Sequence, residues 1–241
     1  MSLQTIVNLA QSIEFTRTSV VAQTASRNGR LFVQERSSVK PWVFTIEPPA
    51  QLPWTDYRSV VENILGYDRH TEHLIYFGQA TYGNSNQVWL NPYQGSLTFS
   101  GSGGYSLAML DYIYITATSG NTITINVSNA GITAGTTIFK AGDYIQPSGT
   151  GSDSLPYRYP YTVAADVVKG SGETTKVVTI NRNFIAQTNY NPVSGSTNQN
   201  RLTAGSNCHW NVLVTKLPTI KFVSHRSIQF TGNFDCVESV I

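Results

Sequence analysis

The closing stretch "RSIQFTGNFDCVESVI" (Arg226–Ile241) alternates between apolar and polar side chains. Its apolar members are Ile228, Phe230, Phe234 and Cys236, its polar members are Gln229, Thr231, Asn233 and Asp235, and Gly232 stands in register between them. Period two is typical of a half-buried strand. We expect one strand of ten residues or more, about 33 Å long at the usual rise per residue, which is long for a compact domain. Such a strand needs pairing with another part of the chain to hold it.

Composition favours strands and turns over helices. The 241 residues suffice for one large β domain or two smaller ones, each with its own core. Charged residues make up 12%, about half the usual share, beside 19 Gly, 13 Tyr and 10 Phe. We expect other protein to cover much of the outer surface; a solvated Ser, Thr and Asn surface is the alternative.

Charge and hydropathy exclude several classes of protein. The net charge is +2, with 16 Lys and Arg against 14 Asp and Glu, so no basic surplus drives specific binding to nucleic acid. The N-terminus has no basic region before a long apolar run, and eighteen apolar residues never follow one another. We therefore expect neither secretion by a signal peptide nor a membrane span. Cys208 and Cys236 are expected to be reduced and buried.

Both ends of the chain predict the same kind of sheet. After Cys208 the strand patterns of the N-terminal part return in "HWNVLVTKLPTIKFVS" (209–224), and we expect the closing strand to complete the sheet that begins at the N-terminus. Alternation predicts strands at "SIEFT" (12–16), "RLFVQ" (30–34) and "WVFTIE" (42–47), then at "EHLIYFGQ" (72–79) and "QVWLNPY" (87–93). One segment, 55–65, has helical periodicity, with Thr55 as its cap and Gly66 as a left-handed C′ residue. Because this helix has one apolar stripe, we expect it to lie across a sheet.

The middle of the chain differs from the two ends in amino-acid composition. Residues 95–205 are rich in Gly, Ser, Thr and Asn and contain short strand patterns, with a turn at Gly142-Asp143. These patterns predict a small barrel between glycine-rich linkers. The expected organisation is a split β-sandwich domain, 1–94 with 206–241, and an inserted β-barrel domain, 95–205. The fold class is mainly β with one packed helix.

No catalytic motif accompanies these strands. His70 and His73 have the spacing of a metal-binding pair, but structural zinc needs four ligands and a solvated connection is the preferred interpretation. The acidic residues are scattered, and no nucleophile, zinc-protease or phosphate-loop motif occurs. We expect no enzyme activity, no cofactor and no metal.

Two surfaces are candidates for binding. Tyr157, Tyr159 and Tyr161 could stack on sugar rings, although the preferred interpretation makes them core or interface anchors. Separately, the opening segment is basic, with Arg17, Arg27, Arg30, Arg36 and Lys40 against Glu14 and Glu35. It is either a solvated face or, with a hairpin turn at Asn28-Gly29, a device that grips a neighbouring subunit.

Several strings carry a resemblance that covers nearly the whole chain: "VAQTASRNGRLFVQERSSVKPWVFTIEPP", "TIFKAGDYIQPSG", "YRYPYTVAADVVKGSG", "VTKLPTIKF" and "IQFTGNFDCVESVI". They resemble virion structural proteins of contractile-tailed bacteriophages, of the cyanophage and marine myovirus type. This resemblance implies a tail-tube, baseplate-hub or distal-tail component. The implied fold is a tail-tube-like β-sandwich or barrel with one helix and a long hairpin.

The resemblance also implies how the protein works. Copies would close a ring, expected to be a hexamer, around the tail channel, and connect the tube to the baseplate. Partners would be the protein itself and other tail-tube and baseplate proteins; phage DNA would pass without specific binding, and no membrane is involved. The location would be the virion tail or baseplate, assembled in the host cytoplasm.

Ring contacts are assigned to residues 17–40 and 226–240, because a ring needs a hairpin on one side of each subunit and a receiving edge on the other. The interface residues are Arg17, Arg27, Asn28, Gly29, Arg30, Arg36, Gln229, Thr231 and Asn233. The alternative function is a carbohydrate or host-receptor binding module of the tail, with Tyr157, Tyr159 and Tyr161 as contacts.

Overall fold

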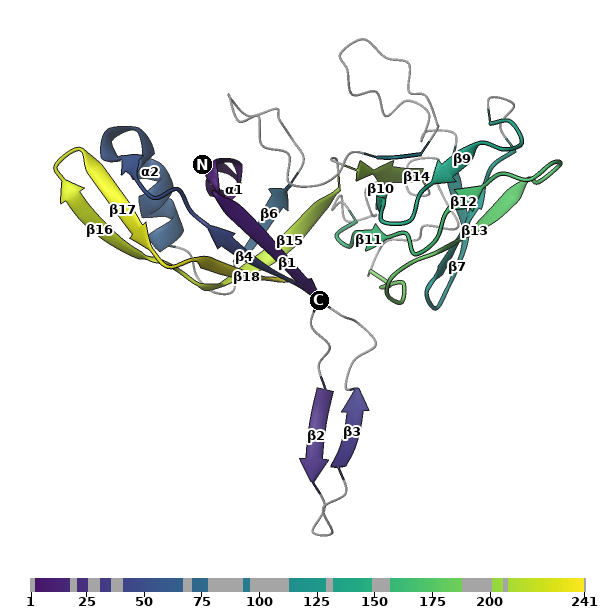
Figure 1. Cartoon of the computed structure of the whole chain (residues 1–241), viewed down its shortest axis with the longest axis horizontal. Coiled ribbons are helices and arrows are strands. Elements are labelled where there is room, and N and C mark those ends of the chain that lie inside the picture. Colours follow the sequence, from purple (N-terminus) through teal and green to yellow (C-terminus); the bar gives the residue numbers. More distant parts are fainter. Residues whose placement is uncertain are drawn as a thin grey trace. The chain divides into compact units, whose positions relative to one another are not determined.

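A computed structural model describes residues 3–17, 21–25, 31–35, 41–66, 71–77, 93–95, 113–128, 132–148, 157–187, 201–205 and 208–240. In this part the chain is mainly β, with several antiparallel sheets and two helices (Figure 1). The chain forms two compact units. The first comprises Met1–Ile75, Tyr82–Gln87 and Trp210–Ile241, and the second Tyr76–Thr81 and Val88–His209.

A five-stranded antiparallel sheet organises the first unit. Its strand order is β1 (Ser12–Arg17), β4 (Trp42–Glu47), β18 (Phe234–Glu238), β15 (His209–Lys216) and β6 (Glu72–Tyr76). A three-stranded sheet has the order β16 (Thr219–Ser224), β17 (Ser227–Thr231) and β5 (Leu52–Pro53). β2 (Val21–Ala25) and β3 (Leu31–Glu35) pair with each other.

The two ends of the chain share one sheet, as predicted from the strand patterns that return after Cys208. Cys236 pairs with Phe44 of β4 on one side and with Val214 of β15 on the other, so β18 is an interior strand. Its apolar residues Phe234 and Cys236 are buried. The C-terminal strand is therefore held by pairing with a segment about 190 residues away in sequence, as the bond from the Thr45 hydroxyl to Asp235 also shows.

The prediction of a single long strand is wrong. The alternating stretch is two strands, β17 and β18, which belong to different sheets. Gly232 lies between them with φ +90°, a conformation that a strand residue with a Cβ does not adopt. The apolar residues on both sides of this break stay buried, so the period-two pattern survives although the strand does not.

Replacement of Gly232 by Ala should destabilise the protein by about 1–2 kcal/mol, because an L-residue is strained at positive φ. A Cβ at Gly232 meets nothing within 4 Å, so this cost is one of backbone conformation and not of collision. Gly66→Ala is the matched control, since Gly66 has no positive φ and should tolerate Ala at little cost. Urea unfolding measures both; equal effects of the two substitutions would contradict the explanation.

The predicted helix is present as α2 (Trp54–Leu65), but both predicted caps are wrong. The helix begins one residue early, and the Trp54 N–H donates to the Arg226 carbonyl at 2.8 Å. Thr55 lies inside the first turn, where its hydroxyl donates to Asp56 at 3.1 Å. Gly66 continues the helical pattern by donating to the Glu62 carbonyl, without a left-handed φ.

A second helix, α1 (Leu3–Leu9), was not predicted. Leu3, Ile6, Val7 and Ala10 are buried, which is the i, i+3, i+4, i+7 spacing of an amphipathic helix. Seven residues are too few to be helical in isolation, so packing holds α1 in place. None of the helices in the described residues is both long and apolar enough to span a membrane.

The core of the first unit is aromatic. Trp210 is fully buried, and its ring meets Trp42 edge-on at 6.4 Å and Phe44 at 5.9 Å between centroids. These three rings come from β4 and β15, which lie on either side of β18. The core therefore depends on the pairing of strands from distant parts of the sequence.

The second unit contains a six-stranded antiparallel sheet with the order β11 (Tyr161–Thr162), β10 (Tyr144–Ser148), β14 (Arg201–Ala204), β7 (Tyr114–Ser119), β8 (Thr122–Asn126) and β13 (Thr175–Thr179). β9 (Thr137–Phe139) and β12 (Val167–Val168) form a separate pair (Figure 1). The predicted turn before β10 is present, with Gly142 at φ +93°.

None of the described sheets closes into a barrel. The two edges of the six-stranded sheet nevertheless meet just beyond β11 and β13, at an isolated bridge between Val163 and Ile180. The Ala164 N–H donates to the Thr179 carbonyl at 2.8 Å beside that bridge. The sheet is thus strongly curved, with its two ends joined at one point.

Candidate assembly surface

The hairpin of β16 and β17 carries the most exposed large apolar side chains of the first unit. Phe222 is 58% and Val223 54% exposed, and both lie on β16. β16 is the outer strand of its sheet, with β17 on one side and no described strand on the other. A free strand edge with apolar side chains is a site where another chain can pair.

Phe222 and Val223 are adjacent in sequence, near the tip of the hairpin. The register shifts between Phe222 and Ser224, which makes Val223 the extra residue of a β-bulge. A partner strand that covers this edge therefore meets two exposed apolar side chains close to the tip of the hairpin.

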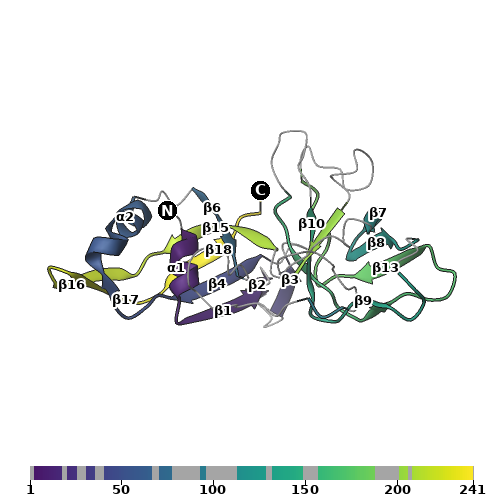
Figure 2. The same cartoon turned by 90° about the horizontal axis from the view of Figure 1, so that it is seen from above.

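Phe222 is fixed by an aromatic neighbour. Its ring meets Trp54 of α2 edge-on at 4.8 Å, and the Arg58 guanidinium lies 6.0 Å from the Trp54 ring centroid. In both views α2 lies beside the β16–β17 hairpin (Figures 1 and 2). The exposed ring is thus held in one position before any partner binds.

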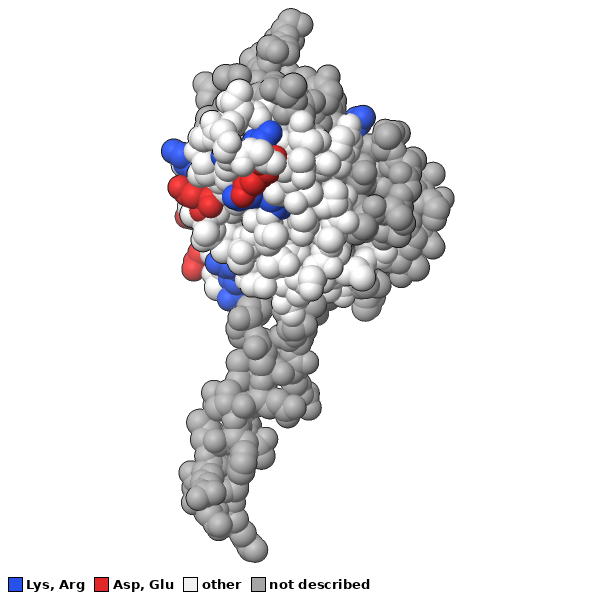
Figure 3. All heavy atoms as spheres, turned by 90° about the vertical axis from the view of Figure 1, so that its right-hand side faces the viewer, with Lys and Arg blue, Asp and Glu red and all other residues white. Residues whose placement is uncertain are grey.

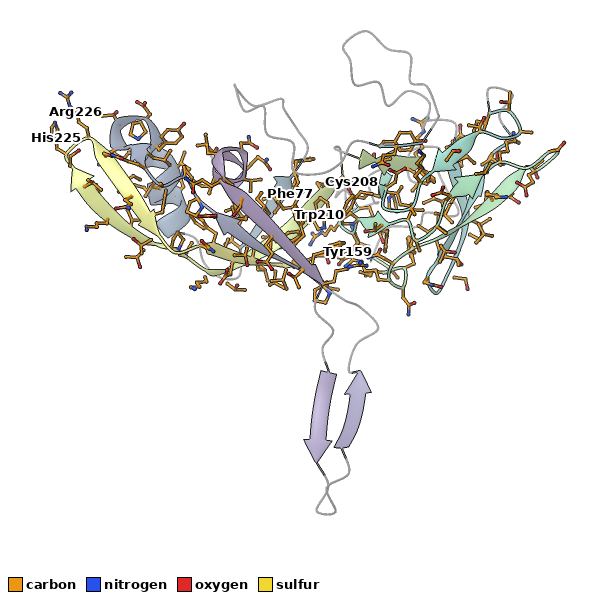
Figure 4. The ribbon with its side chains drawn as sticks, in the orientation of Figure 1. Phe77, Tyr159, Cys208, Trp210, His225 and Arg226 are labelled. Carbon is orange, nitrogen blue, oxygen red and sulfur yellow. The ribbon has the colours of Figure 1, made fainter. Side chains whose placement is uncertain are left out.

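The hairpin is basic. Lys221, His225 and Arg226 lie on it, and no Asp or Glu occurs between Lys216 and Asp235 in the sequence. His225 and Arg226 are at the turn and point away from the ribbon (Figure 4). The surface therefore combines exposed apolar groups with positive charge.

One of the two outer strands of the five-stranded sheet, β1, has an edge of the opposite character. β1 is the outer strand next to β4, and its Glu14 is exposed. Ser12 at the start of β1 donates to the exposed Glu47 of β4 at 2.6 Å. These two carboxylates make this end of the edge acidic, whereas Arg17 lies at its far end, 5.1 Å from the Trp42 ring centroid.

The predicted interface residues are spread over several elements. Gln229 and Thr231 are exposed and Asn233 is half-buried. However, β17 is paired with β16 along its length and β18 is interior, so the free edge expected within 226–240 belongs to β16. Arg27, Asn28, Gly29, Arg30 and Arg36 lie outside the described residues, between or after β2 and β3.

The tyrosines proposed as sugar contacts are core residues. Tyr157, Tyr159 and Tyr161 are each 0% exposed. The hydroxyls of Tyr157 and Tyr161 lie 2.5 Å apart, and Tyr157 donates to the Ile185 carbonyl at 2.7 Å. Buried rings with bonded hydroxyls offer no face to a sugar, so the prediction of glycan contact at these residues is wrong and the core interpretation holds.

Titratable groups in the interior do not form a metal site in the described residues. His73 is buried and desolvation lowers its pKa, while His70 lies outside the described residues. Cys208 and Cys236 are free and buried, as expected; burial raises the pKa of both thiols, that of Cys236 to about 12.

The pKa of His209 is lowered to about 4, mainly by desolvation, against a smaller opposing effect of its bond to the Tyr157 backbone. Because the folded pKa lies below the ordinary 6.5, the neutral ring stabilises the fold above pH 6.5, and that stability is lost as the pH falls towards 4. We expect a loss of up to about 3 kcal/mol over this range. His209→Gln should flatten the dependence, measured by urea unfolding at several pH values; an unchanged slope would contradict this explanation.

The surface of the second unit seen in Figure 3 is largely uncharged, with basic and acidic side chains in small mixed groups. Lys176 and Glu173, for example, form an ion pair at 2.8 Å. The view shows no broad basic patch of the kind that binds a phosphate backbone.

Phe222, Val223 and Lys221 were not among the predicted interface residues. Their signal was the string "KFVSHR", in which two adjacent apolar residues interrupt the alternation of a strand between basic residues.

Comparison of the chain with protein-family models and with curated proteins gives no match.

Proposed function

We propose that the protein is a non-enzymatic structural subunit of a contractile bacteriophage tail or baseplate. Copies of it form a ring, expected to be a hexamer, around the tail channel at a hub or distal-tail position. The ring connects the tube to the baseplate and binds itself and other tail-tube and baseplate proteins. It needs no cofactor, and it functions in the virion after assembly in the host cytoplasm.

One observation carries this proposal: β16 is a free strand edge whose Phe222 and Val223 are more than half exposed. Soluble proteins rarely leave such an edge uncovered, because it invites pairing with another chain. A ring of identical subunits covers it by heterologous contacts that close on themselves. The near-balance of charge, 16 basic against 14 acidic residues, supports a channel through which DNA passes without specific binding.

The finer fold is part of the proposal. The first unit would be a tail-tube-like β-sandwich ring domain with α2 packed on it, and the second a small barrel inserted into it. The pairing of β18 with β4 supports the first assignment. The bridge between Val163 and Ile180 at the two ends of the curved sheet supports the second.

Sedimentation velocity of the purified protein tests the function. We expect a ring-sized oligomer at micromolar concentration, and weaker assembly of a variant that lacks residues 21–35, which are part of the segment 17–40 assigned to ring contacts. A wild-type protein that remains monomeric at the highest soluble concentration would overturn the proposal. With Tyr157, Tyr159 and Tyr161 in the core, no observation favours the carbohydrate-binding alternative.

A further inference from the structure

The strand edges of the first unit fit each other. We propose that β16 of one copy adds to β1 of the neighbouring copy as an antiparallel strand, with Lys221 opposite Glu14. This inference rests on the proposed ring, and it names the two surfaces and the register that would hold the ring together.

Both strands have the free edge that this pairing requires. Among the described strands, β1 has only β4 beside it and β16 has only β17. Each is six residues long, so the two edges match in length. Addition of a strand to a free edge supplies main-chain hydrogen bonds, and the alternating side chains supply specificity.

The faces of the two strands also match. On β1, Glu14 is exposed, whereas Ile13 and Phe15 are half-buried and point to the other face. On β16, Lys221 shares one face with Thr219, and Phe222 shares the other with Ile220. With Lys221 opposite Glu14, Phe222 falls beside Ile13 and Ile220 beside Phe15. The pairing therefore places charge against charge and apolar side chains against apolar side chains.

Charge selects the antiparallel direction. In that direction the hairpin turn, with His225 and Arg226, lies towards Ser12 and the adjacent Glu47. A parallel arrangement would place the same basic turn towards Arg17 at the other end of β1. Opposite charges attract and like charges directly opposite each other destabilise a strand pair, so the antiparallel direction is favoured.

Charge reversal provides the first test, in the full-length protein. Lys221→Glu alone and Glu14→Lys alone should each weaken assembly at least tenfold, and the double variant Lys221→Glu with Glu14→Lys should restore most of it. The matched control combines Lys221→Glu with Glu62→Lys, because Glu62 is exposed on α2 and not on the β1 edge. This control should stay as weak as the Lys221→Glu variant. The proposed register would be overturned if Glu62→Lys restored assembly of the Lys221→Glu variant, or if Glu14→Lys failed to restore it.

Cysteine pairs provide the second test. Residues directly opposite each other in a strand pair have Cβ atoms close enough for a disulfide, and the native cysteines are buried. Mixing a Glu14→Cys protein with a Lys221→Cys protein under mild oxidation should give a cross-linked dimer on a non-reducing gel. Thr16→Cys with Thr219→Cys should also cross-link if the strands are antiparallel, whereas Ser12→Cys with Thr219→Cys should not.

The outcomes separate this inference from the proposed function. A wild-type ring that forms without the cross-links and is insensitive to charge reversal at Lys221 and Glu14 would overturn the β16–β1 contact and leave the ring intact. A wild-type protein that forms no oligomer would overturn the proposed function and the contact with it. If Lys221→Glu instead abolished binding of a single-stranded DNA probe while the ring persisted, the basic hairpin would be a polyanion site and the contact would be wrong.

Discussion

Removal of residues 233–241 should unfold the first unit. β18 is the middle strand of a five-stranded sheet, so its loss leaves β4 and β15 without a partner on their facing edges. The truncation also removes Phe234 and Cys236 from the core. It removes Glu238 as well, whose carboxylate accepts a hydrogen bond from the backbone N–H of Trp42 at 3.1 Å. Each large apolar side chain that is lost costs about 1.5–3 kcal/mol, and each buried donor left without its acceptor about 1–3 kcal/mol. The sum is comparable with the whole stability of a typical domain.

Hydrogen exchange resolved by peptide measures this effect. In the truncated chain, protection of β1, β4 and β15 should be lost, whereas protection of β7, β8 and β10 in the second unit should remain. Removal of Val240 and Ile241 alone is the control, because it leaves β18 whole and Val240 is 38% exposed. Unchanged protection of β4 and β15 after the longer truncation would show that the folding of these strands does not depend on β18.

The substitution Trp210→Ala should have the largest effect of any single change in the first unit. Trp210 is fully buried and makes edge-on contacts with Trp42 and Phe44. Truncation of a buried Trp leaves a cavity, and the expected loss of unfolding free energy is about 3–5 kcal/mol. The cavity would lie beside the rings of Trp42 and Phe44, in the core of the first unit. We therefore expect the loss of stability in that unit.

Urea unfolding, followed by the fluorescence of the remaining tryptophans, measures this loss. Phe222→Ala is the control, since that ring is 58% exposed, and its effect should stay below about 1 kcal/mol in the unassembled protein. A loss below about 1 kcal/mol for Trp210→Ala would show that these rings do not form the centre of the core.

Patterns of local periodicity predicted much of this fold. The alternation of the last residues predicted which side chains are buried, and the 3.6-residue period predicted α2. The strand patterns that return after Cys208 predicted that the closing strand joins the N-terminal sheet. The break at Gly232 was not predicted, because a glycine in register keeps the alternation intact whether the strand continues or turns. α1 was missed because its seven residues span only about two helical turns, too short a stretch for their apolar spacing to indicate a helix.

The candidate site was harder to predict because it depends on long-range pairing. A sequence pattern shows that residues 219–224 form a strand, but only the topology shows that this strand is outermost in its sheet. For the same reason the receiving edge was assigned to residues 226–240, one strand away from the free edge. Burial of Tyr157, Tyr159 and Tyr161 likewise depends on residues outside "YRYPY"; Phe184, for example, stacks on the rings of Tyr157 and Tyr161.

The most direct test of the central claim, that the first unit presents strand edges for copies of itself, is class-averaged electron microscopy of the purified protein. The account predicts closed rings with a central pore. A field of single, separate molecules at concentrations where the protein is soluble would contradict it.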